Sequence, residues 1–173
     1  MNYYSKSHTV NVWTKIIIDK FNEIGFNERE KHIATILSIT SKAEIAKIKQ
    51  ASFNAFGKSL GIESFEDACV KLGVSNDSPK IIGIGDKLAN KFIAEYKLTI
   101  IIKALNNGWY PNWTDATEYK YWSWFDLSEG FSYCYASYFS SDTSVPSALL
   151  LKSRELVLYC GEKFLPLYKV YML

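Results

Sequence analysis

The sequence YKYWSWFDL-SEG-FSYCYA, which runs from Tyr119 to Ala136, decides the fold of this chain. Two short runs of alternating residues lie on either side of its centre. The first run alternates Tyr119, Tyr121 and Phe125 with Lys120, Trp122, Trp124 and Asp126, and the second alternates Phe131, Tyr133 and Tyr135 with Ser132, Cys134 and Ala136. A period of two is typical of β-strands, and Ser128-Glu129-Gly130 between the runs favours a hairpin loop. This stretch therefore predicts an antiparallel hairpin.

The segments that flank the hairpin predict one helix before it and one after it. Apolar residues recur at helical spacing over residues 86–106, and Asn107-Gly108 ends the pattern because glycine adopts a left-handed turn without steric cost. After the hairpin, residues 148–151 predict a third strand. Ser153 then predicts the N-cap of a final helix, whose inward residues we expect to be Leu156, Tyr159, Cys160, Phe164 and Leu167. Pro166 should kink or interrupt that helix, because proline lacks the N–H group and clashes with the preceding turn.

Helical patterns also fill the first part of the chain. We expect helices over residues 10–25 and 28–39. The sequence Ser41-Lys42-Ala43-Glu44 matches a capping box and predicts a third helix, which should stop near Gly57 or Gly61. Residues 64–67 give a second capping signal, which predicts a short helix that ends at Gly73. Together these elements predict an α+β fold, with N-terminal helices followed by the hairpin, the third strand and the C-terminal helix.

The polar loop from Val74 to Lys80 is the best candidate for a boundary within the chain. We predict a helical N-terminal region over residues 1–73 and a second region over residues 80–173. The second region would hold the long helix, the small antiparallel sheet and the C-terminal helix. The alternative is one single domain over residues 9–173.

The charge of the chain argues against a sequence-specific reader of duplex DNA. Its 173 residues carry a formal net charge of only +2, and Arg29 and Arg154 are its only arginines. Lysine cannot replace the two-point contact of arginine with guanine or phosphate. The three cysteines are odd in number and lie far apart, which indicates reduced thiols. Neither a signal peptide nor a membrane-spanning stretch is evident, so we expect a cytoplasmic protein.

Residues that carry catalysis or bind metal are sparse. The histidines are His8 and His32, and no His, Cys, Asp and Glu residues stand at the spacing of metal ligands, so we expect no metal site and no cofactor. Asp126 and Glu129 flank the hairpin turn, where acids are more often turn formers than acid–base catalysts. No nucleophile and base form a local pair. We therefore expect no catalytic residues and a protein that is not an enzyme.

The sequence Gly83-Ile84-Gly85 is similar to the turn of a helix-hairpin-helix element, whose backbone N–H groups bind a DNA phosphate. The preceding residues, Ser75 to Pro79, do not fit the first helix of such a hairpin. We therefore favour a flexible loop that ends in a helix start over a phosphate contact.

The aromatic block supports three readings. Residues 109–139 hold four of the five tryptophans of the chain. The rings can fill the core between a small sheet and helices, form a hot spot for another protein, or stack the bases of a single-stranded nucleic acid. Both faces of the first strand carry large rings, and a small sheet does not bury both completely. We therefore expect one core face and one partly exposed face.

The second half of the chain resembles a family of uncharacterised proteins from phages and prophages of Bacteroidetes. Residues 104–113, ALNNGWYPNW, and 118–125, EYKYWSWF, carry the resemblance, together with LKSREL over residues 151–156 and the terminal LYK over residues 167–169. It covers residues 64–173, with two departures: Pro166 interrupts the last helix, and Val145-Pro146-Ser147 replaces a glycine-containing turn. The resemblance implies a mobile-element protein in the cytoplasm of a bacterial host, and no activity comes with it.

We therefore predict a non-enzymatic phage or mobile-element accessory protein that binds a host protein, such as an anti-defence inhibitor of the anti-CRISPR type. We expect its binding face to contain Trp109, Trp113, Tyr121, Trp122 and Trp124, with Lys120 and Lys152 at the rim. The first alternative is a single-stranded nucleic-acid-binding accessory protein that uses the same residues. The second alternative is a virion structural protein.

Overall fold

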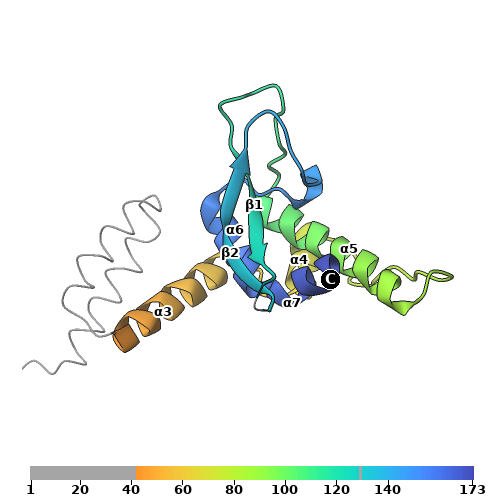
Figure 1. Cartoon of the computed structure of the whole chain (residues 1–173), viewed down its shortest axis with the longest axis horizontal. Coiled ribbons are helices and arrows are strands. Elements are labelled where there is room, and N and C mark those ends of the chain that lie inside the picture. The colour runs from red at the N-terminus through yellow and green to blue at the C-terminus, as the bar shows by residue number, and fades with distance from the viewer. Residues whose placement is uncertain (1–41, 129) are drawn as a thin grey trace, which may run out of the picture. The chain divides into compact units, whose positions relative to one another are not determined.

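The computed structural model describes residues 42–128 and 130–173 (Figure 1). The chain divides into two compact units, Met1–Ser59 and Leu60–Leu173. This division falls before the loop that the sequence suggests as a boundary, because helix α4 (Phe65–Leu72) packs against helix α5 (Asp86–Asn106) within the second unit. The helices expected over residues 10–25 and 28–39, and Ser41 of the first capping box, lie outside the described residues.

Helix α3 spans Lys42–Leu60 and so covers the end of the first unit. Ile48 of this helix is buried. The helix ends before Gly61, which has a φ of +64°. Glycine takes this left-handed conformation without the steric penalty that other residues meet, so the predicted stop near Gly61 is confirmed.

Helices α4 and α5 begin and end close to where the sequence signals place them. The Ser64 side chain accepts a hydrogen bond from the Asp67 backbone N–H, and the Asp67 carboxylate accepts one from the N–H of Glu63. These two bonds satisfy donors that have no partner inside the helix. Helix α5 ends at Asn107, which has a left-handed φ of 49° and is followed by Gly108 at +85°. Its second half forms the core of the unit, through the buried residues Ala94, Leu98, Ile101, Ile102 and Leu105.

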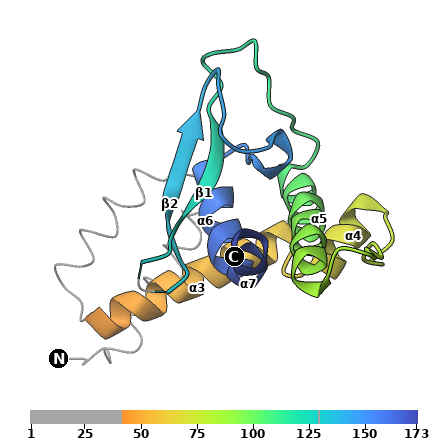
Figure 2. The ribbon, with the colours of Figure 1, turned by 45° about the vertical axis from the view of Figure 1, so that its right-hand side comes forward.

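The predicted hairpin is present as strands β1 (Lys120–Asp126) and β2 (Ser132–Phe139), which pair antiparallel (Figures 1 and 2). Tyr121 pairs with Tyr138 and Trp124 pairs with Tyr135. The register then shifts, so that Phe125 pairs with Tyr133 and Cys134 has no partner in β1. This extra residue is a β-bulge, which bends a strand and re-aims the side chains beyond it.

The predicted third strand is wrong for most of its length. Residues Ser147–Leu149 form a short 3-10 helix, η1, and only Leu151 joins the sheet, through an isolated bridge with Tyr121. In that bridge each backbone N–H donates to the carbonyl of the other residue, at 2.9 and 2.8 Å. Leu149, Leu150 and Leu151 are all buried. A regular strand would send alternate side chains to opposite faces, whereas the chain leaves the 3-10 turn at Leu149 and is extended at Leu150, and all three leucines are buried.

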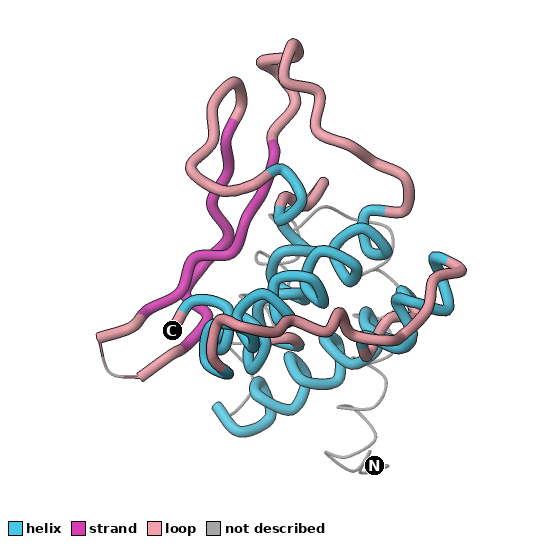
Figure 3. Tube along the Cα trace, turned by 90° about the vertical axis from the view of Figure 1, so that its right-hand side faces the viewer, coloured by secondary structure: helices cyan, strands magenta, loops and turns pink. Residues whose placement is uncertain are grey.

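The last helix is interrupted at the predicted place. Helix α6 (Arg154–Lys163) ends at Phe164, and helix α7 (Leu165–Met172) starts there with Pro166 in its first turn, where a missing N–H costs nothing. The Ser153 side chain caps α6 by accepting from the Leu156 N–H. Helix α6 packs against both strands, and α7 packs against α5. Figure 3 shows the two strands beside the group of helices. The second unit is thus a small hairpin on a layer of helices, and the predicted α+β class is confirmed.

Candidate functional site: the aromatic hairpin

The pleat of the hairpin separates its side chains into an inner and an outer face. On the inner face, Ser123 lies beside Gly161 of α6, and the Phe125 ring lies 4.6 Å from the Tyr168 ring of α7. Because side chains alternate along a strand, Trp122 and Trp124 of β1 point to the opposite, outer face. The residues predicted for one binding face therefore divide between two faces, since Tyr121 belongs with Ser123 and Phe125.

Close packing fixes the inner face against α6. A Cβ atom added to Gly161 would overlap the Tyr133 ring and would come within 3.2 Å of the Ser123 hydroxyl oxygen. Only glycine lets the helix approach the sheet this closely. Burial raises the pKa of Tyr133 to about 12, as expected for a phenol that is removed from water. The inner face is therefore core rather than a binding surface.

Trp109 and Trp113 belong to the loop that precedes β1, and polar contacts bind this loop together. The Trp109 indole N–H donates to the Glu118 carboxylate at 3.1 Å, and the Asn112 backbone N–H donates to the same carboxylate at 2.8 Å. The Trp113 ring centroid lies 5.5 Å from the Lys120 ammonium. Both tryptophans are half-buried. Their contacts give them a structural role in this loop.

Lys120 is not at the rim of a binding face: its side chain is fully buried, which corrects the sequence-based prediction. Its ammonium donates to the backbone carbonyls of Asp115, Glu118 and Ser140 at 2.8–2.9 Å. It also lies 3.4 Å from the Glu118 carboxylate. A lysine ammonium has three donors, so the three carbonyls satisfy it fully, and the carboxylate balances its charge. Lys120 therefore ties the loop, the start of β1 and the end of β2 to one another.

The pKa of Glu118 is lowered, chiefly by the hydrogen bond from the Asn112 backbone N–H. Partial burial acts in the opposite direction, and the bonds from Trp109 and Lys120 lower the pKa further. Each of these donors favours the charged form of the carboxyl group. Glu118 is thus the anion around which the loop is organised.

Lys152 is exposed, and its ammonium contacts the backbone at the end of α5. It donates to the carbonyl oxygen of Asn106 at 3.1 Å, at the end of α5. The Asn106 side chain in turn accepts from the Lys152 N–H and donates to the Leu150 carbonyl. A cation at the C-terminus of a helix is stabilised by the helix dipole. Lys152 thus holds the end of α5 to the segment before α6.

The outer face carries a continuous row of rings. Trp122 stacks on Phe139 with centroids 5.7 Å apart, and it meets Trp124 edge to face at 4.9 Å. Trp124 stacks on Tyr135 at 5.9 Å with only 9° between the ring planes. Trp122 is half-buried, whereas Trp124 and Tyr135 are 44% and 47% exposed. The accessible centre of this face is therefore the Trp124–Tyr135 pair.

Tyr135 and Phe139 are members of this face that the sequence analysis did not select. A hairpin without a bulge that pairs Asp126 with Ser132 would place Cys134 opposite Trp124. The bulge at Cys134 brings Tyr135 there instead. The alternation of the second run did mark Tyr135 as a strand residue, but nothing in the sequence marks the bulge.

A third ring cluster lies at the other end of the sheet. Tyr119 and Tyr138 are 4.6 Å apart between centroids, and both contact Tyr121. Burial, followed by the nearby Glu155 carboxylate, raises the pKa of Tyr121. Tyr121 therefore joins α6 to two exposed tyrosines rather than to the tryptophan row.

Of the two acids at the hairpin turn, Asp126 lies among the described residues. The Asp126 carboxylate accepts hydrogen bonds from the side chain and the backbone N–H of Ser128, which lower its pKa. This arrangement is typical of a turn former. Glu129 lies outside the described residues. Within residues 42–128 and 130–173, no group of three or more His, Cys, Asp or Glu residues is placed to hold a metal ion.

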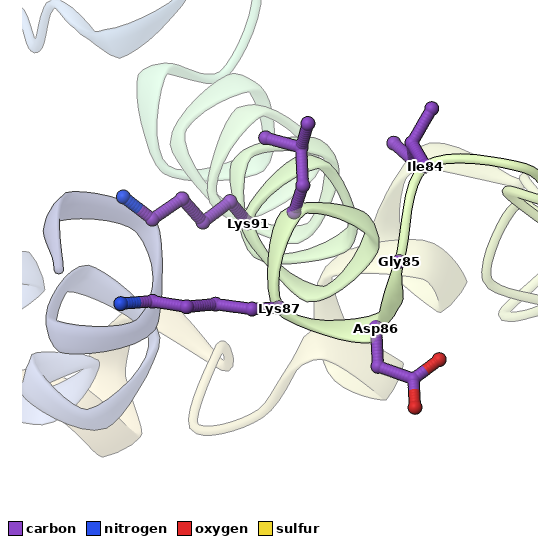
Figure 4. A pocket seen from close by; sticks show the side chains of 6 residues that line it. Ile84, Gly85, Asp86, Lys87 and Lys91 are labelled. Atoms are coloured by element: carbon purple, nitrogen blue, oxygen red, sulfur yellow. The ribbon is translucent and has the colours of Figure 1, made fainter.

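Gly83-Ile84-Gly85 directly precedes α5, and Gly85 is its N-cap (Figure 4). The φ values are +85° at Gly83 and +77° at Gly85. Within the described chain, no helix lies between Leu72 and Asp86, so the first half of a helix-hairpin-helix is missing. An open hollow of about 410 Å³ lies here, lined in part by Lys87 and Lys91. The two ammonium groups point the same way, and the Asp86 carboxylate points elsewhere (Figure 4). The favoured interpretation as a loop followed by a helix start agrees with this geometry.

Comparison with known proteins gives no match to a family model, a curated protein or a solved structure. The resemblance to phage and prophage proteins therefore stays a prediction. Among the described residues, none of the helices has the length and apolar character needed to cross a membrane.

Proposed function

We propose that this chain is a non-enzymatic accessory protein that binds another protein through the outer face of its hairpin. The observation that carries the proposal is the stacked pair of Trp124 and Tyr135. Each of these residues is nearly half exposed. Tryptophan and tyrosine are enriched in binding hot spots because they bury a large area at a small cost in conformational entropy. The half-buried Trp122 meets Trp124 edge to face and stacks on Phe139, so the exposed pair continues into a row of packed rings.

The charge around this face favours a protein partner over a single-stranded nucleic acid. Lys120 is the only basic residue between positions 109 and 151, and its ammonium is buried and saturated with carbonyl oxygens. Proteins that stack bases combine aromatic rings with a cationic groove that follows the phosphates. The outer face offers the rings without the cations. Single-strand binding therefore ranks second.

The resemblance to phage and prophage proteins of Bacteroidetes suggests the class of partner. A protein encoded by a mobile element acts in the cytoplasm of its bacterial host, where it meets host and defence proteins. A compact protein with a rigid aromatic surface suits an inhibitor that blocks the surface of such a target. We therefore propose a host defence protein, such as a CRISPR effector, as the partner.

The test compares proteins captured from a nuclease-treated Bacteroidetes lysate by three tagged full-length chains. These are the wild type, the Trp124→Ala/Tyr135→Ala variant and the control Tyr110→Ala, which removes an exposed ring from the loop before β1. We expect the wild type and the control to capture the same partner and the double variant to lose it. Equal capture by all three chains would contradict the proposal. In a parallel capture from a lysate without nuclease, recovery of nucleic acid alone would instead favour single-strand binding.

A further inference from the structure

The two edges of the sheet differ in their pairing. Strand β1 pairs with β2 on one side and bridges to Leu151 through Tyr121 on the other. Strand β2 lies beside β1 and pairs only with β1 among the described residues (Figure 2). The edge of β2 that faces away from β1 therefore presents backbone N–H and C=O groups that no described strand pairs. A two-stranded sheet is marginal, and most sheets have about four to six strands.

The residues of β2 lack the usual protection of an edge strand. Natural edge strands carry lysine, proline or inward-pointing charges that prevent pairing with another chain. Strand β2 reads SYCYASYF and contains neither a charged residue nor a proline. Its one irregularity is the bulge at Cys134, near the hairpin turn. The regular part, from Tyr135 to Phe139, is a neutral edge that can accept another strand.

We propose that this edge pairs antiparallel with the same edge of a second copy of the chain, which gives a four-stranded sheet across a two-fold axis. A second copy suits this edge because an uncharged strand that faces itself brings no like charges together. It also sets tyrosines opposite small residues or other rings, and cross-strand pairs of this kind stabilise sheets. The regular part of β2 is centred on Ser137, so the axis passes between the two Ser137 residues.

This symmetry has a consequence for the outer face. Antiparallel pairing of identical edges requires a two-fold axis perpendicular to the sheet, which keeps the same face of both copies on the same side. The two Trp124–Tyr135 pairs would then lie on one side of a continuous sheet. The dimer thus doubles the proposed binding face, although the pairing itself depends only on β2.

The test measures the mass of the full-length protein by sedimentation over a range of concentrations. We expect a dimer for the wild type. Ser137→Lys places two ammonium groups against each other at the axis and should raise the dimer dissociation constant by about tenfold or more. Val70→Lys, the matched control, adds the same charge at a position on α4 that is 82% exposed, and should leave the dimer intact. A monomeric wild type, or a dimer that Ser137→Lys does not weaken, would overturn the proposal.

A cysteine experiment tests the register and does not need a variant with an added charge. In a Cys134→Ser background, Ser137→Cys would place two thiols opposite each other, while Cys69 and Cys160 stay buried. Under mild oxidation we expect a disulfide-linked dimer to form fastest for Ser137→Cys, and more slowly for Ala136→Cys or Tyr138→Cys. Equal, slow cross-linking at all three positions would contradict the paired edge, even if Ser137→Lys fails to fold.

Discussion

The aromatic block contains two groups of rings that look alike in sequence and differ in structure. Trp109 and Trp113 lie in a loop held by the Glu118 carboxylate and the buried Lys120 ammonium. Trp124 and Tyr135 stack on the outer face of the hairpin and are nearly half exposed. The two groups differ in their polar neighbours. The Glu118 carboxylate and the Lys120 ammonium each make several contacts that organise the first group. A tryptophan-rich motif can thus specify a scaffold and a surface at the same time.

The largest expected effect comes from removing the cation of the loop. Lys120→Met keeps most of the side-chain volume but leaves three buried carbonyls and the Glu118 carboxylate without their donor. We expect the free energy of unfolding to fall by about 3 kcal/mol, measured by denaturant titration. Lys163→Met is the control, because Lys163 forms a partly exposed ion pair with Glu63 at 3.2 Å, and we expect a change of less than about 0.5 kcal/mol there. Similar small losses in both variants would show that the buried lysine does not organise the loop.

The next effect tests whether the inner face is core. Gly161→Ala adds a methyl group where the Tyr133 ring already lies, so the ring or the helix must move. We expect a loss of about 2 kcal/mol in the free energy of unfolding, which is typical of overpacking. Adding Tyr133→Ala should make the extra methyl group almost neutral. If Gly161→Ala is as stable as the wild type, then α6 does not pack closely on the sheet.

Measuring stability against pH tests the role of the Glu118 carboxylate in the loop before β1. The pKa of Glu118 in the folded protein lies below its ordinary value of 4.5, so ionised Glu118 stabilises the fold above that pH. This contribution is lost as the pH falls through the folded-state pKa. We therefore expect Glu118→Gln to be less stable than the wild type at neutral pH and the difference to shrink in acid. A stability difference that does not change between neutral and acidic pH would contradict this role.

The smallest effect is expected on the outer face. Trp124 and Tyr135 bury less of their surface on folding than core rings do. Each alanine substitution should therefore lower the free energy of unfolding by less than about 1 kcal/mol. Thermal and denaturant unfolding of the two single variants and the double variant would measure both the losses and the coupling between the rings. Losses as large as that of Lys120→Met would place the pair in the core.

The sequence predicts the helices better than the sheet and the site. Local signals mark α5 and the helix caps at Ser64 and Ser153, and Pro166 marks the break between α6 and α7. These features depend on residues a few positions apart, which is why they can be read directly from the sequence. The register of the hairpin and the burial of Lys120 depend on contacts with distant segments, such as Ser140 at the end of β2.

The positions of the predicted binding residues also depend on contacts with distant segments of the chain. The sequence-based hypothesis places five rings on one face, whereas their positions depend on the pleat, the bulge and the charge pair of the loop. These rings are Trp109, Trp113, Tyr121, Trp122 and Trp124. Lysine is usually exposed, and the hypothesis accordingly places Lys120 and Lys152 at the rim. Burial of Lys120 becomes visible only when Asp115, Glu118 and Ser140 converge on its ammonium.

The most direct test of the division between scaffold and surface measures the solvent exposure of the individual tryptophans. The chain would be labelled with 5-fluorotryptophan, the ¹⁹F resonances assigned by single Trp→Phe substitutions, and their broadening by a soluble paramagnetic agent recorded. We predict strong broadening of Trp124 and clearly weaker broadening of Trp109 and Trp113. Equal broadening of Trp124 and the two loop tryptophans would contradict the division of the aromatic block into a structural loop and an exposed face.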